Sequence, residues 1–327
     1  MNDKMLDIIG LADEKYLHEA EGKPMMKQTG HRRKFSAKFV AVAAAAAVMT
    51  VTAGAYAVAK LSHKDSVEHY YNENMASDIE QKGYVVNQVT QNKHIKMTLE
   101  NMLVDENYAY GVVTVEALDE VGEKAFLTEP VSYLLDENGK YIEKGYLSSM
   151  IGVVMNGDNY KLTKQAHMIK IYLRDPFGDN KVEKPQKAQI VFSKYFDNYN
   201  NRVTTKSDIP KDEFEGLSFD IDLKPNMQTL RLESASGHKA VISGFMLDVQ
   251  YDVKNVNTHF YDNVPNKLKL NYTDGKSRTL SSDYNWKQTD FTPEGGSAND
   301  YRFTINEVLD LSKLESIEIA GETYKVK

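Results

Sequence analysis

The chain has 327 residues, of which 41% are hydrophobic and 10% aromatic, and its formal net charge is −7. It contains no cysteine, which excludes disulfides, thiolate metal ligands and a cysteine nucleophile. Residues 61–327 hold 31 basic and 41 acidic side chains. Such an acidic region repels phosphate backbones, so nucleic acid is not expected as a partner.

Residues 1–22 predict an amphipathic helix that ends at Gly22 and Pro24. A helix this short is only marginally stable by itself, so an apolar stripe on it predicts a binding partner. The stub is acidic, which favours a protein groove over the membrane surface, and a weakly ordered tail is the alternative. The residues at helical spacing, which are the candidate partner-binding residues, are Met5, Ile8, Ile9, Ala12, Tyr16 and Leu17.

An uncharged stretch of 21 residues, Phe39–Ala59, follows the stub. At about 1.5 Å per residue, a helix of this length crosses a hydrocarbon core of roughly 30 Å. A basic segment on its amino-terminal side predicts a cytoplasmic amino terminus and an extracytoplasmic carboxyl terminus. The sequence therefore predicts a single-pass plasma-membrane protein. Its residues 39–59 are expected to contact lipid. A buried helix of a soluble domain and a cleaved export signal at Ala53-Gly54-Ala55 remain alternatives. The predicted topology signal consists of Arg32, Arg33, Lys34 and Lys38.

Residues 60–83 predict a juxtamembrane helix, running from Ser62 to Lys82 and stopped by Gly83. Ser62 with Asp65 forms a plausible amino-terminal cap. An i, i+4 stripe is expected to pack on the domain that follows. The stripe consists of Val67, Tyr71, Met75 and Ile79.

From Tyr84 onward the hydrophobic period changes to two, as in β-strands. We expect a first β-sandwich over residues 84–196, a polar linker over 197–216 and a second sandwich over 217–327. The predicted fold is therefore mainly β: one transmembrane helix followed by two antiparallel immunoglobulin-like β-sandwiches, with one larger sandwich as the alternative. Hairpin turns are expected at residues 136–139, 274–275 and 320–321, and one helical turn at Leu309–Leu314.

Strand Phe245–Val253 has the clearest alternation, with Asp248 on the face opposite its apolar residues. His94 and His238 each open a strand and are expected to face solvent. The single tryptophan, Trp286, is expected to plug the end of a sandwich or, alternatively, to be an exposed contact residue.

Motifs that carry chemistry are missing. There is no zinc helix, phosphate loop or nucleophile elbow, and Ser236-Gly237-His238-Lys239 matches Ser-x-x-Lys by spacing alone. Asp136 and Asn138 are spaced like the start of a calcium loop, but Leu147 stands where the bidentate glutamate belongs. We therefore expect no catalytic residue, no cofactor, no metal site and no enzymatic activity.

The layout resembles a family of membrane proteins from Gram-positive bacteria. The stub Ile9–Ala20, the basic segment, one span and the opening strands Val86–Val115 are similar to proteins with an extracytoplasmic domain of unknown function, DUF4179, and Tyr301–Val326 is similar to the immunoglobulin-like module that often follows it. Some relatives are named anti-sigma factors. The resemblance implies a signalling or regulatory protein that holds a sigma factor or another regulator on its stub, with an extracytoplasmic ligand that the sequence does not identify. The alternative is an envelope-anchored binding or adhesion module.

Overall fold

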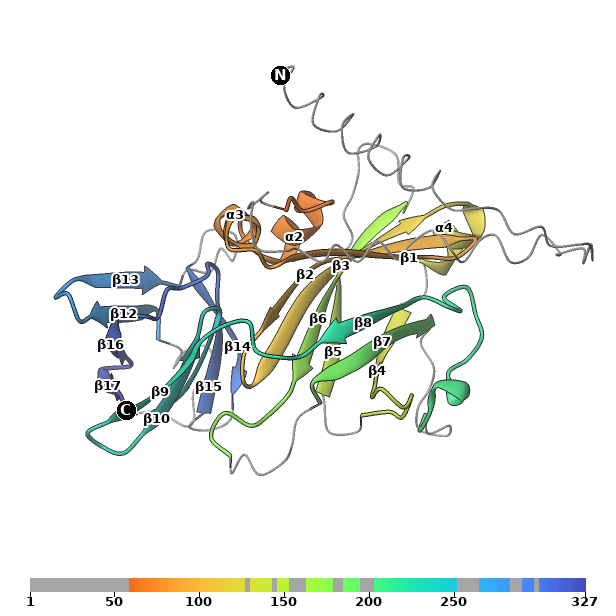
Figure 1. The fold of residues 1–327 in the computed structure, drawn as a ribbon. Helices are drawn as coiled ribbons and strands as arrows, with labels where there is room; N and C mark the ends of the chain where they lie inside the picture. The colour runs from red at the N-terminus through yellow and green to blue at the C-terminus, as the bar shows by residue number, and fades with distance from the viewer. Residues whose placement is uncertain are drawn as a thin grey trace, which may run out of the picture. The chain divides into compact units, whose positions relative to one another are not determined.

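Antiparallel β-sheet dominates the computed structural model (Figure 1). The structure describes residues 59–126, 130–142, 146–152, 163–178, 185–194, 203–251, 265–282, 290–296 and 300–327. Within these residues the strands form three antiparallel sheets, of five, three and nine strands. The prediction of a mainly β chain with antiparallel sheets is confirmed.

The five- and three-stranded sheets face each other around one hydrophobic core and form the first module. The first sheet has the order β1-β2-β3-β6-β5, with Val85–Gln91 (β1), Ile95–Val104 (β2), Tyr108–Ala117 (β3), Lys164–Tyr172 (β6) and Tyr146–Gly152 (β5). The second has the order β4-β7-β8, with Pro130–Leu135 (β4), Lys187–Lys194 (β7) and Ser218–Asp222 (β8). Alternating residues such as Met97 and Leu99 fill the space between the sheets.

The boundary of the first module differs from the expected one at residue 217. Strand β8 pairs with β7, so it belongs to the first module. The described part of the expected linker is also part of this module, because Phe214 is fully buried in the core of the first module. Polar composition suggested a linker there, but a few apolar side chains suffice to bind such a segment to a core.

The second module is a single curled sheet rather than two facing sheets. Its order is β13-β12-β16-β17-β9-β10-β11-β15-β14. The edge strands meet at one end, where Ser281 and Asp290 exchange two hydrogen bonds of 2.8 and 2.9 Å, so the sheet is nearly closed around its own core. The strands are Thr229–Ser234 (β9), Lys239–Ser243 (β10), Met246–Gln250 (β11), Lys267–Tyr272 (β12), Ser277–Ser281 (β13), Phe291–Gly296 (β14), Asp300–Ile305 (β15), Leu314–Ile319 (β16) and Glu322–Val326 (β17).

Two helices stand where the sequence predicts one. Lys64–Tyr70 (α2) and Glu73–Gln81 (α3) are separated at Tyr71 and Asn72, whose backbones are extended. Asn72 caps α3 by accepting a hydrogen bond from the Met75 N–H at 2.8 Å. Ser62 does not cap α2, whose N-cap position is His63. The predicted stripe is nevertheless buried, because the break turns the chain without moving these side chains away from the sheet.

The stripe belongs to a third core that both modules share. It joins α2 and α3 to the outer face of the five-stranded sheet and to Met227, Phe245, Met246 and Val308 of the second module. In Figure 1 the two helices lie beside β2 and β3. A chain that enters through α2 and α3 is therefore packed against both modules at once.

The turns follow the sequence closely, and one predicted helical turn does not form. Gly139, Gly275 and Gly321 all have positive φ in the expected turns. Leu309–Leu314 is not helical: Leu309 and Leu311 are buried in the core of the second module. The remaining short helices are Glu120–Ala125 (α4) and the 3-10 turn Lys206–Asp208.

Several predictions concern residues outside the described ranges. These are the stub residues 1–38, the membrane segment apart from Ala59, residues 197–202 of the expected linker, and Trp286. Among the helices in the described ranges, none has the length and apolar character needed to cross a bilayer.

Candidate functional site

The backbone of residues 60–63 is held by side chains from three elements, an arrangement we call the N-terminal clasp. Asn87 of β1 donates to the Lys60 carbonyl at 2.6 Å and accepts from the Ser62 N–H at 3.2 Å. Glu80 of α3 accepts from the Leu61 N–H at 3.0 Å. Asn87 has a φ of 51° at an irregularity in the pairing of β1, which suits asparagine. Consecutive backbone groups are thus bound before α2 begins.

Glu80 also binds the side chain of Lys60, at 3.0 Å. Burial tends to raise the pKa of Glu80, but the hydrogen bonds from Lys60 and Leu61 outweigh it and leave the pKa below its usual value. This carboxylate is therefore charged near neutral pH and contributes a charge-assisted hydrogen bond to the clasp.

His63 completes the clasp. Its N–H donates to Glu100 Oε2 at 3.0 Å, and its ring Nδ1 lies 2.7 Å from Glu100 Oε1. Glu100 lies on β2 and is fully buried. On the other side of the ring, Nε2 lies 3.5 Å from Glu116 Oε2.

Helix α2 is also fixed to the five-stranded sheet. The Tyr70 hydroxyl donates to the Ala166 carbonyl at 2.7 Å, and Lys164 pairs with Asp65 at 2.5 Å. At the far end of α3, Asp78 accepts from the Val308 N–H at 2.8 Å, and Lys82 donates to the Val308 carbonyl. The segment from residue 60 to residue 82 therefore has polar contacts with both modules in addition to its buried stripe.

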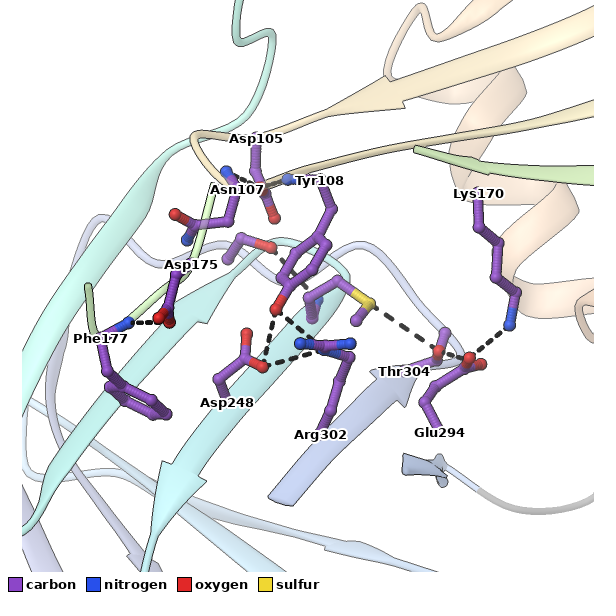
Figure 2. A network of polar contacts seen from close by, with 12 residues as sticks. Asp105, Asn107, Tyr108, Lys170, Asp175, Phe177, Asp248, Glu294, Arg302 and Thr304 are labelled. Atoms are coloured by element: carbon purple, nitrogen blue, oxygen red, sulfur yellow. Dashed lines mark hydrogen bonds and ion pairs between the residues drawn. The ribbon is translucent and has the colours of Figure 1, made fainter. Parts of the chain in front are cut away.

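A buried polar network links the modules directly (Figure 2). Tyr108 of β3 donates to Asp248 Oδ1 at 2.8 Å. Arg302 of β15 donates from Nε to the Tyr108 hydroxyl at 2.8 Å and to Asp248 Oδ1 at 3.0 Å. Its guanidinium lies 4.7 Å from the Tyr108 ring centroid and 4.9 Å from that of Tyr172, which is cation–π geometry.

Asp248 is 3% exposed, although the alternation of its strand placed it on the polar face. That face is covered by the first module. Burial raises the pKa of Asp248 to about 6, against the opposing effects of Arg302 and the Tyr108 hydrogen bond. Nothing in the local sequence distinguishes a polar face that meets solvent from one that meets another module.

A second buried pair lies beside this network in Figure 2. Lys170 of β6 pairs with Glu294 of β14, and Thr304 donates to Glu294 at 2.6 Å. Two buried tyrosines, Tyr71 and Tyr110, lie near Glu294, and the hydroxyl of Tyr110 has no hydrogen-bond partner among the described residues. Burial, followed by the charge of Glu294, raises the pKa of both phenols. Both tyrosines are therefore neutral near pH 7.

Two surface hollows have polar walls. One, of about 350 Å³, lies between α3 and the second module, where Arg278 pairs with Glu307 at 2.6 Å. The other, of about 640 Å³, lies at the end of β7 and β8. Lys206 there donates to Gln189 at 2.7 Å, and Gln189 donates to Asp220 at 2.8 Å.

The histidines predicted to face solvent are instead half-buried and paired. His94 Nδ1 lies 2.7 Å from Asp119, and His238 Nδ1 lies 2.9 Å from Glu322. Ser236 donates to Glu322 at 3.0 Å and lies 3.4 Å from the same His238 nitrogen. In the described ranges, no three His, Asp or Glu side chains converge as metal ligands.

The structure does not describe the sequence-predicted site residues, all of which precede residue 59. The clasp and the polar network were not foreseen. Their contacts join the chain at residue 60 to the helices, and the helices to both modules.

No protein-family model and no curated protein matches the sequence. Among solved structures, the chain is similar to a conserved domain protein from Bacillus anthracis known from its crystal structure. The two are 12% identical, the match covers 71% of this chain and 75% of that one, and the TM-score is 0.34. We infer neither fold nor function from a likeness at this level.

Proposed function

We propose that this chain is a single-pass membrane protein that passes a signal between an extracytoplasmic β-rich part and a cytoplasmic partner held by its amino-terminal helix. The membrane segment is residues 39–59, and the partner is a sigma factor or another regulator. Kinship with DUF4179 proteins belongs to this proposal. So does an immunoglobulin-like origin of the modules, although the second would have to be a form whose two sheets have merged into one.

The N-terminal clasp is the observation that carries the proposal. If the membrane segment served only as an anchor, a flexible linker to the β-rich part would suffice. Such a linker would leave the residues after the membrane segment without side-chain contacts. Here residues 60–63 are bound by Glu80, Asn87 and Glu100, and the helices that follow are buried against both modules. A change in the packing of the modules would therefore reach the first residue after the span.

The test is a crosslinked pull-down with the full chain in its native cells. Replacing Ile8 and Leu17 by Asp places charge on the apolar stripe and should abolish capture of an identified regulator. Asp7→Asn with Glu14→Gln, on the opposite face of the predicted helix, is the matched control and should retain it. A regulator captured equally by both variants, or none captured by the wild-type chain, would rule out the proposed role of the stub.

An envelope-anchored binding module is the second candidate, and the 640 Å³ hollow at the end of β7 and β8 favours it. Its volume is within the usual range of ligand sites. Co-sedimentation of the full chain with purified cell wall tests it. Binding that is lost in Asp220→Ala but kept in Asp274→Ala, an exposed aspartate of the second module, would support this alternative.

A further inference from the structure

The ring of His63 lies between two carboxylates, with Nδ1 2.7 Å from Glu100 and Nε2 3.5 Å from Glu116. A neutral imidazole has one N–H, so it can donate to one of these groups while its other nitrogen turns a lone pair toward the second. An imidazolium donates to both.

The charged groups around His63 are of both signs. Glu100 of β2 is fully buried, and a buried carboxylate requires a compensating charge. Glu116 of β3 also pairs with Lys96 at 2.7 Å, and Asp65 of α2 pairs with Lys164 of β6 at 2.5 Å. The positive end of the α2 dipole disfavours a cation at His63. These neighbours, however, include three carboxylates and only two ammonium groups. The other charged groups on the packed elements are Lys64 and Glu68, which pair with each other, and Glu80, which pairs with Lys60.

We propose that His63 makes the N-terminal clasp a proton-operated latch, closed when the imidazole is charged and loosened when it is neutral. Histidine is the side chain whose charge ordinarily changes between about pH 5 and 8. In the neutral state the ring contributes a weaker hydrogen bond to Glu100 and a repulsive contact with Glu116, so residues 60–63 separate from β2 more often. The signalling meaning of the latch rests on the proposed function, but the latch itself is a property of the folded chain.

Hydrogen exchange of the full chain in detergent micelles tests the latch. The Leu61, Ser62 and His63 amides are the donors of the clasp. Their protection, normalised to the intrinsic exchange rate at each pH, should fall about fivefold between about pH 5.5 and pH 8, because charge roughly doubles the strength of one hydrogen bond. Peptides that cover residues 59–67 report it.

Three variants decide the outcome. His63→Gln should give the same protection at both pH values. Glu116→Gln removes the partly exposed second carboxylate and is the milder change, so it should reduce the response without abolishing it, because the charged ring still binds Glu100 more strongly. His94→Gln breaks a similar histidine–carboxylate pair elsewhere and should keep the wild-type response. Equal protection at both pH values in the wild type, or an unchanged response in His63→Gln, overturns the latch. Neither result depends on a cytoplasmic partner, so failure of the latch is distinguishable from failure of the proposed function.

Discussion

Arg302 and Tyr108 are 194 residues apart in sequence, and the Nε of Arg302 donates to the Tyr108 hydroxyl at 2.8 Å (Figure 2). The same nitrogen donates to Asp248, so one guanidinium satisfies two buried groups, one from each module. This contact therefore joins buried groups of both modules through one side chain.

Replacing Arg302 by Ala should lower the free energy of unfolding by about 3 to 5 kcal/mol at pH 7, because it leaves Asp248 buried without its cation. Denaturant titration measures the effect. Arg278→Ala is the matched control: that arginine pairs with Glu307 at the surface and should cost no more than about 1 kcal/mol. Equal losses in the two variants would contradict a special role for the junction.

The protonation of Asp248 should make stability depend on pH. Its pKa is about 6 in the folded chain against an ordinary 3.8, so the folded state binds the proton more tightly than the unfolded state does. The stability contributed by this group is therefore fully present below about pH 4 and is lost as the pH rises through 6, by about 3 kcal/mol. Between pH 4 and pH 7 the wild type should lose most of that amount relative to Asp248→Asn. A constant difference between the two proteins would show that burial does not raise this pKa.

As the cap of α3, Asn72 should contribute about 1 kcal/mol to the free energy of unfolding. Asn72→Ala removes the acceptor for the Met75 N–H, whereas Asn72→Ser keeps one and should have little effect. Thermal unfolding of both variants checks this. If the segment were a single continuous helix, alanine would instead stabilise it, so the sign of the change decides between the predicted and the observed helix.

Gly122→Ala should destabilise the chain even though Gly122 lies in α4, where alanine normally adds up to about 1 kcal/mol of stability. A Cβ at this position would lie 2.3 Å from the carbonyl oxygen of His94, which is backbone and cannot easily move. A loss of about 1 to 3 kcal/mol is expected in denaturant titration. Increased stability would mean that α4 does not pack against the turn at His94.

Features that depend on residues close together in the chain could be predicted without the structure. The period of two in residues such as Ile95, Met97 and Leu99 predicted a strand with one buried face. Strand β2 forms with these residues in the core of the first module, and from Met97 onward its other face is buried as well. Asp274-Gly275 and Ala320-Gly321 predicted turns because glycine accepts positive φ without strain, and both turns form. The helical stripe from Val67 to Ile79 predicted a buried face even though the helix breaks within it.

Which elements and modules contact each other could be seen only in the tertiary structure. Strand β8 pairs with β7 of the first module, the face of β11 that carries Asp248 is covered by Tyr108, and residues 60–63 are held by Glu80, Asn87 and Glu100. Each of these contacts joins segments far apart in the chain, and its free energy depends on groups that no local window of sequence contains. A local sequence pattern indicates that one face of an element is buried. Only the tertiary structure shows which residues bury it, because burial and charge compensation depend on all neighbouring groups in space.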